Sequence, residues 1–584
     1  MTQETFDHVV IGSGFGGSVS AMRLAEKGYR VLVLERGRRY EDRDFARSNW
    51  NLRRYLWAPA LRCFGILQIS PFRNVFVLHG SGVGGGSLGY ANVLTAPDAA
   101  TFQTPAWRQL AEWGELLAPH FETARRMLGV AENPRLGPAD HELRAIAEEL
   151  GTGDTFRPVT VGAYFGAPGQ DAGAVADPYF DGEGPERRPC NHCGGCMVGC
   201  RNGSKNTLVK NYLWFAERWG AEVRAEARVR DVRPLPDGQP DGARYEVVYR
   251  SSVRLLRRRT RVVRARHVVF AAGALGTMRL LLRCRDVTRS LPRLSRRLGD
   301  MVRTNSEALL GVVNRHRTTD WSAGLAITSI VNIDPVTTIE PVRYPAGSSA
   351  MRYLSGPLVT HGGAGRRIWE SVRDIVQRPG DFLRSHFLPG WAQRTTILLV
   401  MQTVDNSLRL RLGRSPFTFF RRDLVSLPAE GEQMIPSTID VAHHVARRFG
   451  ARTDGAPLGS INEGLFGIPM TAHILGGCPF GRTADEGVVG LDCQVHGHPG
   501  LYVVDGSIMP GNPGVNPSLT ITALAEYAMS QVPPRRGTVR QVPRAARAAL
   551  PVAGVAENAP ARGRAESMPT PIRAAEPRVG AGVS

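Results

Sequence analysis

The 584-residue chain has only eight cysteines and three lysines, and it has no long apolar run. Eight cysteines are too few for a disulfide-stabilised scaffold, so we expect a reducing, cytoplasmic environment. The longest stretch without Asp, Glu, Lys or Arg is residues 74–97, and its six glycines exclude a stable membrane helix. The N-terminus lacks a basic region followed by an apolar core and a cleavage site, which argues against a signal peptide.

Because lysine is rare, all but three of the 73 basic residues are arginine, and the formal net charge is +20. Some of this charge lies in the C-terminal tail and some in the arginine-rich segment 254–261. Neither segment has the pattern of a nucleic-acid-binding motif, so we expect no nucleic-acid partner. Loose, peripheral contact with an anionic membrane is the more plausible consequence of the charge. The hydrophobic fraction of 42% and the length indicate a globular chain of at least two domains.

The first forty residues have the pattern of a βαβ dinucleotide-binding unit. Phe6–Ile11 predicts a buried strand, and a second apolar strand ends at Glu35. Between them, Gly12 permits the tight turn, Gly14 lets the backbone approach a pyrophosphate, and Gly17 lets the helix pack on the sheet. Glu35 is expected to accept hydrogen bonds from ribose hydroxyls. A glycine turn in an unrelated α/β protein is the alternative interpretation.

Strand–glycine–helix units recur at residues 267–282 and 501–529. A second glycine cluster at residues 80–87 is either a flexible surface loop or a backbone cradle against a flat cofactor. We favour the cradle, because the flanking sequences are apolar.

The order of these units predicts a discontinuous nucleotide-binding domain that is interrupted by a second domain. We assign residues 1–40, 225–312 and 461–532 to the first domain. Residues 41–224 and 313–460 form the second, including the cradle region 75–95. Residues 533–584 are rich in Pro, Ala and Arg, and we predict a disordered tail there.

These motifs, in this order, resemble the glucose-methanol-choline (GMC) flavoprotein oxidoreductases, and within them the mycobacterial-type cholesterol oxidases. The resemblance is carried by residues 11–18 with Glu35, by 82–88, by 271–273, by 471–478 and by 502–517. It implies FAD as cofactor and an α/β (α+β) fold. That fold has a discontinuous FAD-binding Rossmann-like domain and a substrate domain with a largely antiparallel sheet.

The resemblance also implies which residues bind FAD. Gly12, Gly14 and Gly17 would hold the pyrophosphate, and Glu35 the ribose. The remaining cofactor-binding positions are the isoalloxazine cradle Gly85, Gly86 and Ser87, the adenine-contacting Val229, and Asp505 and Gly506 beside the ribityl chain. The segment Tyr90-Ala91-Asn92 departs from the family pattern, in which many members have an asparagine followed by glycines.

Three residues resemble the family's catalytic groups. His473 would accept the proton of the substrate hydroxyl, unless it is only a structural histidine. Asn516 would donate a hydrogen bond to the reacting oxygen, or cap the helix that follows it. Glu340 would move a proton during isomerisation, since a carboxylate in an apolar pocket has a raised pKa. The alternatives for Glu340 are an exposed loop residue and an ion pair with Arg343.

Four cysteines stand close together in the sequence, as Cys190, Cys193, Cys196 and Cys200. This spacing is that of a bacterial ferredoxin run, although Arg201 replaces the usual proline. An iron–sulfur cluster, a zinc site and reduced thiols in a glycine-containing loop are the three interpretations.

The resemblance thus implies FAD-dependent oxidation of a 3β-hydroxysteroid such as cholesterol, with production of hydrogen peroxide and isomerisation to the conjugated 4-en-3-one. The partners would be a sterol or another bulky hydrophobic alcohol, and oxygen or another electron acceptor. Two alternatives stay open. One is an FAD dehydrogenase of another bulky alcohol, with an iron–sulfur cluster and an acceptor other than oxygen. The other is a flavin-binding electron carrier or sensor.

Overall fold

The computed structural model describes residues 4–538 except 168–172, 255–258, 360–361, 430 and 432–434, and also residue 543. One sheet has the strand order β10-β2-β1-β13-β12-β11, and β23 also pairs with β13. Its strands are β1 (Thr5–Ile11), β2 (Val31–Leu34), β10 (Glu222–Arg224), β11 (Ala227–Pro234), β12 (Tyr245–Ser251), β13 (Thr260–Phe270) and β23 (Leu501–Val503). Strands β10, β2, β1, β13 and β23 pair in parallel. Strand β12 is antiparallel to both of its neighbours, β13 and β11.

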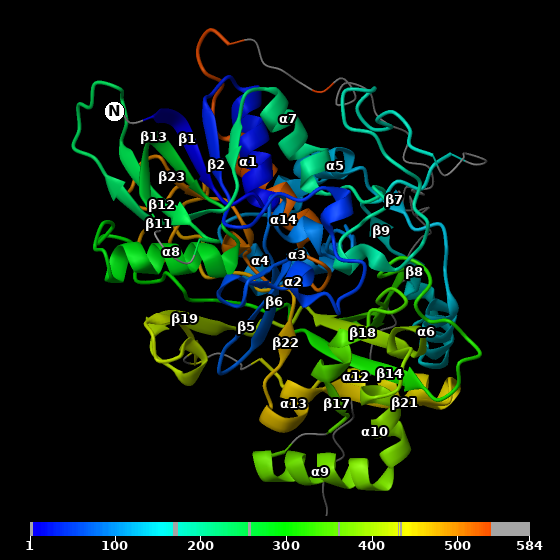
Figure 1. The fold of residues 1–584 in the computed structure, drawn as a ribbon. Coiled ribbons are helices and arrows are strands. Elements are labelled where there is room, and N and C mark those ends of the chain that lie inside the picture. The colour runs from blue at the N-terminus through cyan, green and yellow to red at the C-terminus, as the bar shows by residue number, and fades with distance from the viewer. Residues whose placement is uncertain are drawn as a thin grey trace, which may run out of the picture.

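Five helices pack on this first sheet or on one another beside it (Figure 1). They are α1 (Phe15–Glu26), α5 (Trp113–Leu128), α7 (Tyr212–Arg218), α8 (Ala274–Asp286) and α14 (Ser518–Ser530). Helix α1 packs on α7 and α14, α5 packs on α14, and α8 packs against β11. All residues of α1 are buried, because helices on one side and the sheet on the other enclose it.

A second sheet has the order β17-β21-β14-β18-β16-β15-β8, and all its pairings are antiparallel. Its strands are β8 (Arg157–Pro158), β14 (Ala308–Asn314), β15 (Ser329–Asp334), β16 (Thr337–Val342), β17 (Ser355–Pro357), β18 (Thr395–Gln402) and β21 (Gly455–Ser460). Helices α6 (Pro138–Glu149) and α12 (Asp440–Arg452) cover one face, where Leu398 and Val400 join their core. Because side chains alternate along a strand, Ile397 and Leu399 face the opposite side and line a cavity.

A small third sheet joins the glycine cluster to the segment before His473. In it β6 (Phe76–Gly80) pairs with β5 (Leu67–Pro71) on one side and, in parallel, with β22 (Met470–Thr471) on the other. The remaining strands are β3 (Trp57–Ala58), β4 (Cys63–Phe64), β7 (Ala131–Glu132), β9 (Thr160–Val161), β19 (Leu408–Gly413) and β20 (Asp423–Pro428). The remaining α-helices are α2 (Leu52–Tyr55), α3 (Ala99–Phe102), α4 (Pro105–Arg108), α9 (Ala364–Gln377), α10 (Pro379–His386), α11 (Trp391–Arg394) and α13 (Ile461–Phe466).

The predicted fold class is confirmed, but the sheets do not divide at the predicted boundaries. Strand β10 belongs to the first sheet although it precedes residue 225, and β14 enters the second sheet at residue 308 instead of 313. Helices α5 and α7, from the predicted second domain, pack on the helices of the first sheet. The reason is that α1 and α14 have apolar surfaces that the other elements of the predicted first domain do not bury, and α7 and α5 pack on these surfaces.

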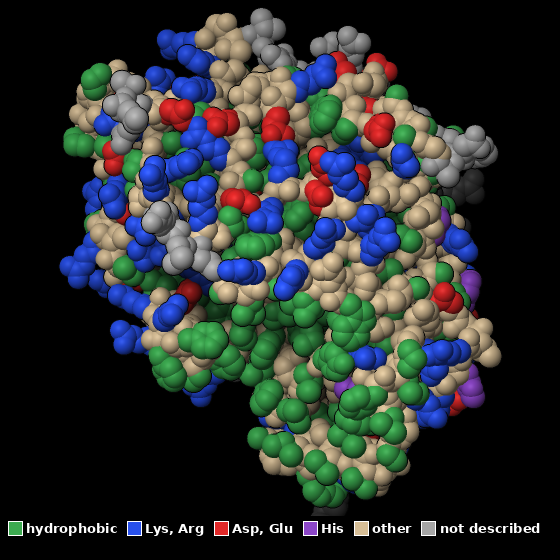
Figure 2. Space-filling model, viewed as in Figure 1, with side chains coloured by type: hydrophobic (Ala, Val, Ile, Leu, Met, Phe, Trp, Pro, Cys, Tyr) green, Lys and Arg blue, Asp and Glu red, His purple; other side chains and the backbone are tan. Residues whose placement is uncertain are grey.

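The first residues of the predicted disordered tail are ordered against the first sheet. The Tyr29 hydroxyl donates to the Pro533 carbonyl oxygen at 2.9 Å, and the Arg535 amide donates to the Lys27 carbonyl oxygen at 3.1 Å. The disorder prediction is therefore wrong for 533–538. Apart from residue 543, the rest of the tail lies outside the described residues, as do residues 255–258 of the arginine-rich segment. Arginines are spread over the upper part of the face seen in Figure 2. No helix in the described ranges is both long and apolar enough to cross a bilayer.

Candidate active site

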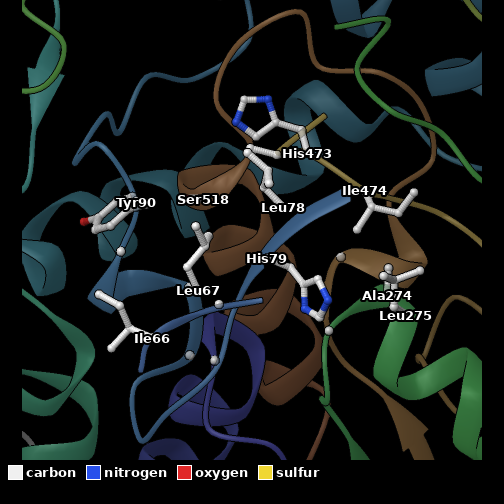
Figure 3. A pocket seen from close by; sticks show the side chains of 18 of the residues that line it. Ile66, Leu67, Leu78, His79, Tyr90, Ala274, Leu275, His473, Ile474 and Ser518 are labelled. Atoms are coloured by element: carbon white, nitrogen blue, oxygen red, sulfur yellow. The ribbon is translucent and has the colours of Figure 1, made fainter. Parts of the chain in front are cut away.

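A cavity of about 460 Å³ is lined by the glycine turn before α1 and by the face of the second sheet opposite α6 and α12. Figure 3 shows some of its lining side chains, among them Tyr90 and His473. Most of the predicted cofactor and catalytic residues line it, namely Gly12, Gly14, Glu35, Gly85, Gly86, Val229, His473, Asp505, Gly506 and Asn516. The predicted residues that do not line it are Gly17, Ser87, Glu340, Cys190, Cys193, Cys196 and Cys200.

The glycine turn before α1 fits a diphosphate. Gly12 has φ +101°, and a Cβ there would lie 2.3 Å from the Ala271 carbonyl oxygen, so only glycine fits. Gly14 is the N-cap of α1, with open space beside it and no side chain capping the helix. The N–H groups of the first turn therefore remain for an anion in the cavity. Gly17 supports the site through packing, because a Cβ there would lie 2.1 Å from the Gly12 carbonyl oxygen.

Glu35 faces this crevice in a fixed orientation. Its Oε2 accepts hydrogen bonds from the Ser13 amide at 3.1 Å and the Ser13 hydroxyl at 2.9 Å, and its Oε1 accepts from the Gly37 amide at 2.7 Å. The carboxylate is buried at the end of β2 and lines the cavity. Such an anchored acceptor suits a ribose hydroxyl.

Sequence reasoning missed a group of arginines near Glu35 and Val229. Arg36, Arg228 and Arg279 line the same part of the cavity. Burial, with repulsion from Arg279, lowers the pKa of Arg228 to about 9, and burial lowers the pKa of Arg36 to about 10. The negative charge of a bound dinucleotide would relieve this repulsion. The arginines, like the glycine turn, therefore suit the binding of a dinucleotide.

The glycine cluster at 80–87 is a packed cradle and not a flexible surface loop. A Cβ at Gly85 would lie 2.5 Å from Gly14 Cα, so the cluster packs its backbone directly on the turn before α1. Ser87 is a correction to the predicted cofactor contacts. Its hydroxyl donates to the Gly84 carbonyl oxygen at 2.7 Å and accepts from the Leu208 amide at 3.1 Å, and it does not line the cavity.

Lys205 is a second residue that sequence reasoning missed. Its buried ammonium donates to the carbonyl oxygens of Leu88 at 3.2 Å, Tyr90 at 2.7 Å and Cys196 at 2.9 Å. It therefore fastens the cradle to the cysteine-containing loop. The only sequence signal is that Lys205 is one of just three lysines in the chain. Tyr90 lines the cavity, and its hydroxyl has no hydrogen-bond partner among the described residues.

His473 follows β22 and is held by a carboxylate that was not predicted. Its Nδ1 lies 3.1 Å from Oε2 of Glu307, a buried residue. The same oxygen accepts from the Thr471 hydroxyl at 2.7 Å and the Ala472 amide at 3.0 Å. Because Nδ1 is engaged, Nε2 is the ring nitrogen available to a substrate. The only sequence signal for Glu307 is the polar run 304–307 before β14.

Asn516 and Glu340 are adjacent, a contact that was not predicted. The Asn516 amide nitrogen donates to Glu340 Oε2 at 3.2 Å, and Asn516 lines the cavity in front of the fully buried carboxyl. Burial raises the pKa of Glu340 to about 8, against the effect of this hydrogen bond and with added repulsion from Glu307. The second oxygen of Glu340 and the side-chain oxygen of Asn516 have no partner among the described residues.

The non-catalytic alternatives for Glu340 and Asn516, given from the sequence, are wrong. Glu340 lies on β16 and is not an exposed loop residue. Arg343 pairs with Asp140 instead, at 3.7 Å. Asn516 does not cap α14, because Pro517 is the N-cap and no side chain caps that helix.

The four cysteines do not form a metal site. Cys193 is exposed whereas Cys196 is buried. The part of the chain that the structure describes, which includes all four, has no group of three or more Cys, His, Asp or Glu placed to hold a metal ion. Burial raises the pKa of Cys190 to about 12 and that of Cys196 to about 11, which favours neutral thiols. The iron–sulfur and zinc interpretations are therefore not supported. The four cysteines are free thiols in a loop, which is the third interpretation.

Comparison with known proteins agrees with this geometry. Family models described as GMC oxidoreductase match residues 184–290 and 466–525, and one described as an NAD(P)-binding Rossmann-like domain matches residues 10–40. The chain is 44% identical to a cholesterol oxidase of Acinetobacter baumannii, over 90% of this chain and 94% of the relative. It is also 44% identical to one of Mycobacterium tuberculosis, over 92% and 93%.

More distant similarities extend over the same length. A long-chain-alcohol oxidase of Arabidopsis thaliana is 24% identical, over 90% of this chain and 67% of the relative. Among solved structures, a fungal aryl-alcohol oxidase superposes with a TM-score of 0.56 at 16% identity, over 91% of this chain and 99% of that one. A formate oxidase gives 0.55 at 13% identity, over 91% and 98%. These structures share the fold.

Proposed function

Since the chain belongs to the GMC oxidoreductase family, we propose that this flavoprotein oxidises the 3β-hydroxyl of a sterol to the ketone, with oxygen as electron acceptor and hydrogen peroxide as product. The observation that carries the proposal is the cavity itself. Its lining includes the dinucleotide crevice, an apolar wall and His473. The cholesterol oxidases that are 44% identical supply the substrate class.

FAD, when bound, supplies the acceptor for the hydride that leaves the carbinol carbon. Gly12, Gly14 and the first turn of α1 would hold its diphosphate, and Glu35 its ribose. His473 Nε2 takes the hydroxyl proton, because Nδ1 faces Glu307 Oε2 at 3.1 Å and leaves Nε2 as the ring nitrogen open to substrate. The second N–H of Asn516 is available to the substrate oxygen, since the first donates to Glu340.

The wall of the cavity suits a bulky apolar alcohol. Ile66, Leu67, Trp391, Ile397 and Leu399 line it, together with Met351 and Leu354. Burial of apolar substrate surface against such a wall contributes about 25 cal/mol per Å². A small polar alcohol would gain little there, so the wall favours a sterol over a sugar.

Isomerisation to the conjugated enone is the second part of the proposal, and it depends on Glu340. The carboxyl lies behind Asn516, away from solvent, and its pKa is raised to about 8. When ionised, such a group can take a proton from the carbon beside the ketone and return it further along the ring, moving the double bond into conjugation.

The test is anaerobic reduction of the purified flavoprotein with cholesterol. We expect the yellow flavin absorbance to bleach, oxygen to restore it with formation of hydrogen peroxide, and His473→Ala to slow the bleaching. If sterol bleaches the flavin but only an added dye reoxidises it, the enzyme is a dehydrogenase. If no alcohol in a panel of sterols, long-chain alcohols and sugars reduces the flavin, the carrier or sensor hypothesis replaces the proposal.

A further inference from the structure

Three residues with polar side-chain atoms lie in the apolar part of the cavity wall. Tyr55, Tyr344 and Trp391 line the cavity and belong to one hydrophobic cluster. They come from different elements, because Tyr55 ends α2, Tyr344 follows β16 and Trp391 begins α11. Each is at most 7% exposed. The oxidation described above uses none of their polar atoms, so these atoms need another explanation.

The polar atoms of the three residues are poorly paired. The hydroxyl oxygens of Tyr55 and Tyr344 lie 3.4 Å apart, which is long for a hydrogen bond between two hydroxyl groups. The indole N–H of Trp391 has no partner in the described part of the chain. Burial raises the pKa of Tyr55 and of Tyr344, so each phenol keeps its proton and can donate it. Leaving buried polar groups without good partners is unfavourable, so a ligand that pairs with them gains affinity.

The three residues lie at the far end of the wall from the reacting groups. On the second sheet, Glu340 pairs with Leu399, and Val342 pairs with Ile397. Tyr344 is four residues beyond Glu340. Because an extended chain rises about 3.3 Å per residue, Tyr344 lies on the order of 13 Å from Glu340 along the wall. A steroid whose first ring lies beside Glu340 therefore brings its fourth ring, or a short group on that ring, close to the three polar residues.

The chemistry of this end favours an uncharged oxygen. Two hydroxyls and one indole N–H offer three donors, and the hydroxyls can also accept. A ketone or hydroxyl oxygen can pair with these groups, whereas a hydrocarbon leaves them unpaired. An ionised carboxylate would need a cation beside it. Among the described residues, however, the Arg and Lys side chains that line the cavity are on β11, on α8 and directly after β2, at the dinucleotide crevice.

We propose that Tyr55, Tyr344 and Trp391 form a subsite for a ketone or hydroxyl oxygen at the end of the substrate opposite the reacting 3β-hydroxyl. We call it the distal oxygen subsite. The inference rests on the proposed function and narrows its substrate class to steroid alcohols that carry a second oxygen on or next to the fourth ring. Cholesterol remains a substrate, but its hydrocarbon end leaves the three polar groups unpaired.

The first experiment measures binding without turnover. The ligands are progesterone, which has a 20-ketone, and 4-pregnen-3-one, which lacks it. Equilibrium dialysis compares the wild-type holoprotein with Tyr55→Phe/Tyr344→Phe and with the control Tyr245→Phe, whose hydroxyl donates to the Pro499 carbonyl oxygen outside the cavity. We expect wild type and control to bind progesterone about tenfold more tightly than 4-pregnen-3-one. The double variant should bind the two ligands equally.

Flavin content and melting temperature show whether each variant is folded, and the single variant Tyr344→Phe replaces the double variant if the latter is unstable. Trp391→Phe removes the indole N–H and should also reduce the preference for progesterone. Equal binding of the two ligands by wild type overturns the proposal. A preference for progesterone that persists in full without the tyrosine hydroxyls overturns it as well.

The second experiment repeats the comparison with alcohols that can be oxidised. Pregnenolone and 5-pregnen-3β-ol differ only in the 20-oxygen, and anaerobic flavin reduction over a range of concentrations gives the apparent affinity for each. We expect wild type to prefer pregnenolone by the same factor of about ten. If both alcohols reduce the flavin with equal apparent affinity, the distal oxygen subsite fails and the proposed function stands. If progesterone binding depends on the tyrosine hydroxyls but no steroid alcohol reduces the flavin, the proposed function fails and the subsite stands.

Discussion

Glu307 lies against His473, with 3.1 Å between Oε2 and Nδ1, in a chain where these residues are 166 positions apart. The carboxylate is fixed in turn by the Thr471 hydroxyl and the Ala472 amide. Two segments thereby meet: the polar run before β14 and the turn after β22. The consequence is chemical, because a carboxylate on Nδ1 sets the tautomer in which Nε2 is a proton acceptor.

The first prediction concerns Glu307→Gln. The glutamine oxygen that accepts from Thr471 and Ala472 would take the place of Oε2 and still face His473 Nδ1, but without the negative charge. A neutral amide stabilises the imidazolium that forms when Nε2 takes the substrate proton less than a carboxylate does. We expect the rate of flavin reduction by sterol to fall about 100-fold with little change in sterol binding. Stopped-flow reduction under argon over a range of sterol concentrations measures both.

The control is Glu463→Gln, which also removes a buried carboxyl whose pKa is raised to about 8 by burial. It should leave the reduction rate within a few-fold of wild type. In the double variant Glu307→Gln/His473→Ala we expect no further loss beyond His473→Ala, because both changes remove one function. Additive losses would mean that Glu307 acts only on stability.

Local patterns made much of the site predictable, and tertiary contacts explain what was missed. The turn at Gly12 and Gly14 is determined by neighbouring residues, so its sequence pattern was sufficient. Glu307 acquires its role only when β14 approaches β22, which no local pattern reports. The cysteine spacing was misleading for the same reason, since spacing does not determine whether side chains converge on one point. Helix α9 exposes the apolar residues Ile368, Trp369 and Val372. Such a face has the same periodicity as a buried one, so the sequence could not tell which side of the helix faces solvent.

The second prediction separates isomerisation from oxidation. In Glu340→Gln the side chain cannot carry the proton, but Asn516 keeps a hydrogen-bond acceptor behind it. We expect hydrogen peroxide formation within about tenfold of wild type and a product that is mainly the unconjugated ketone. Chromatography of the steroid products with ultraviolet detection distinguishes the two ketones. If the variant still forms the conjugated enone at the wild-type rate, Glu340 is not the proton carrier.

The third prediction is a dependence of stability on pH. Burial raises the pKa of Glu340 from about 4.5 to about 8, so the folded state keeps a proton that the unfolded state has lost between these values. The contribution of this group to stability is therefore full below pH 4.5 and decreases as the pH rises toward 8. In principle it amounts to a few kcal/mol. Between pH 5 and 8 the Tm of Glu340→Gln should fall less steeply than that of wild type. Parallel Tm curves would contradict the raised pKa.

The fourth prediction tests the cradle through Gly85→Ala. Gly85 has φ +55°, and a Cβ there would lie 2.5 Å from Gly14 Cα, so the cradle must move away from the turn that would hold the diphosphate. Gly151→Ala is the matched control, since Gly151 also has a positive φ, of +77°, but has open space around it. The control should lose only about 1 kcal/mol, from backbone strain. Gly85→Ala should lose more than this and also retain less FAD after gel filtration. Absorbance of the flavin relative to protein measures the retention, and equal FAD content in the two variants would show that the cradle does not contact the cofactor.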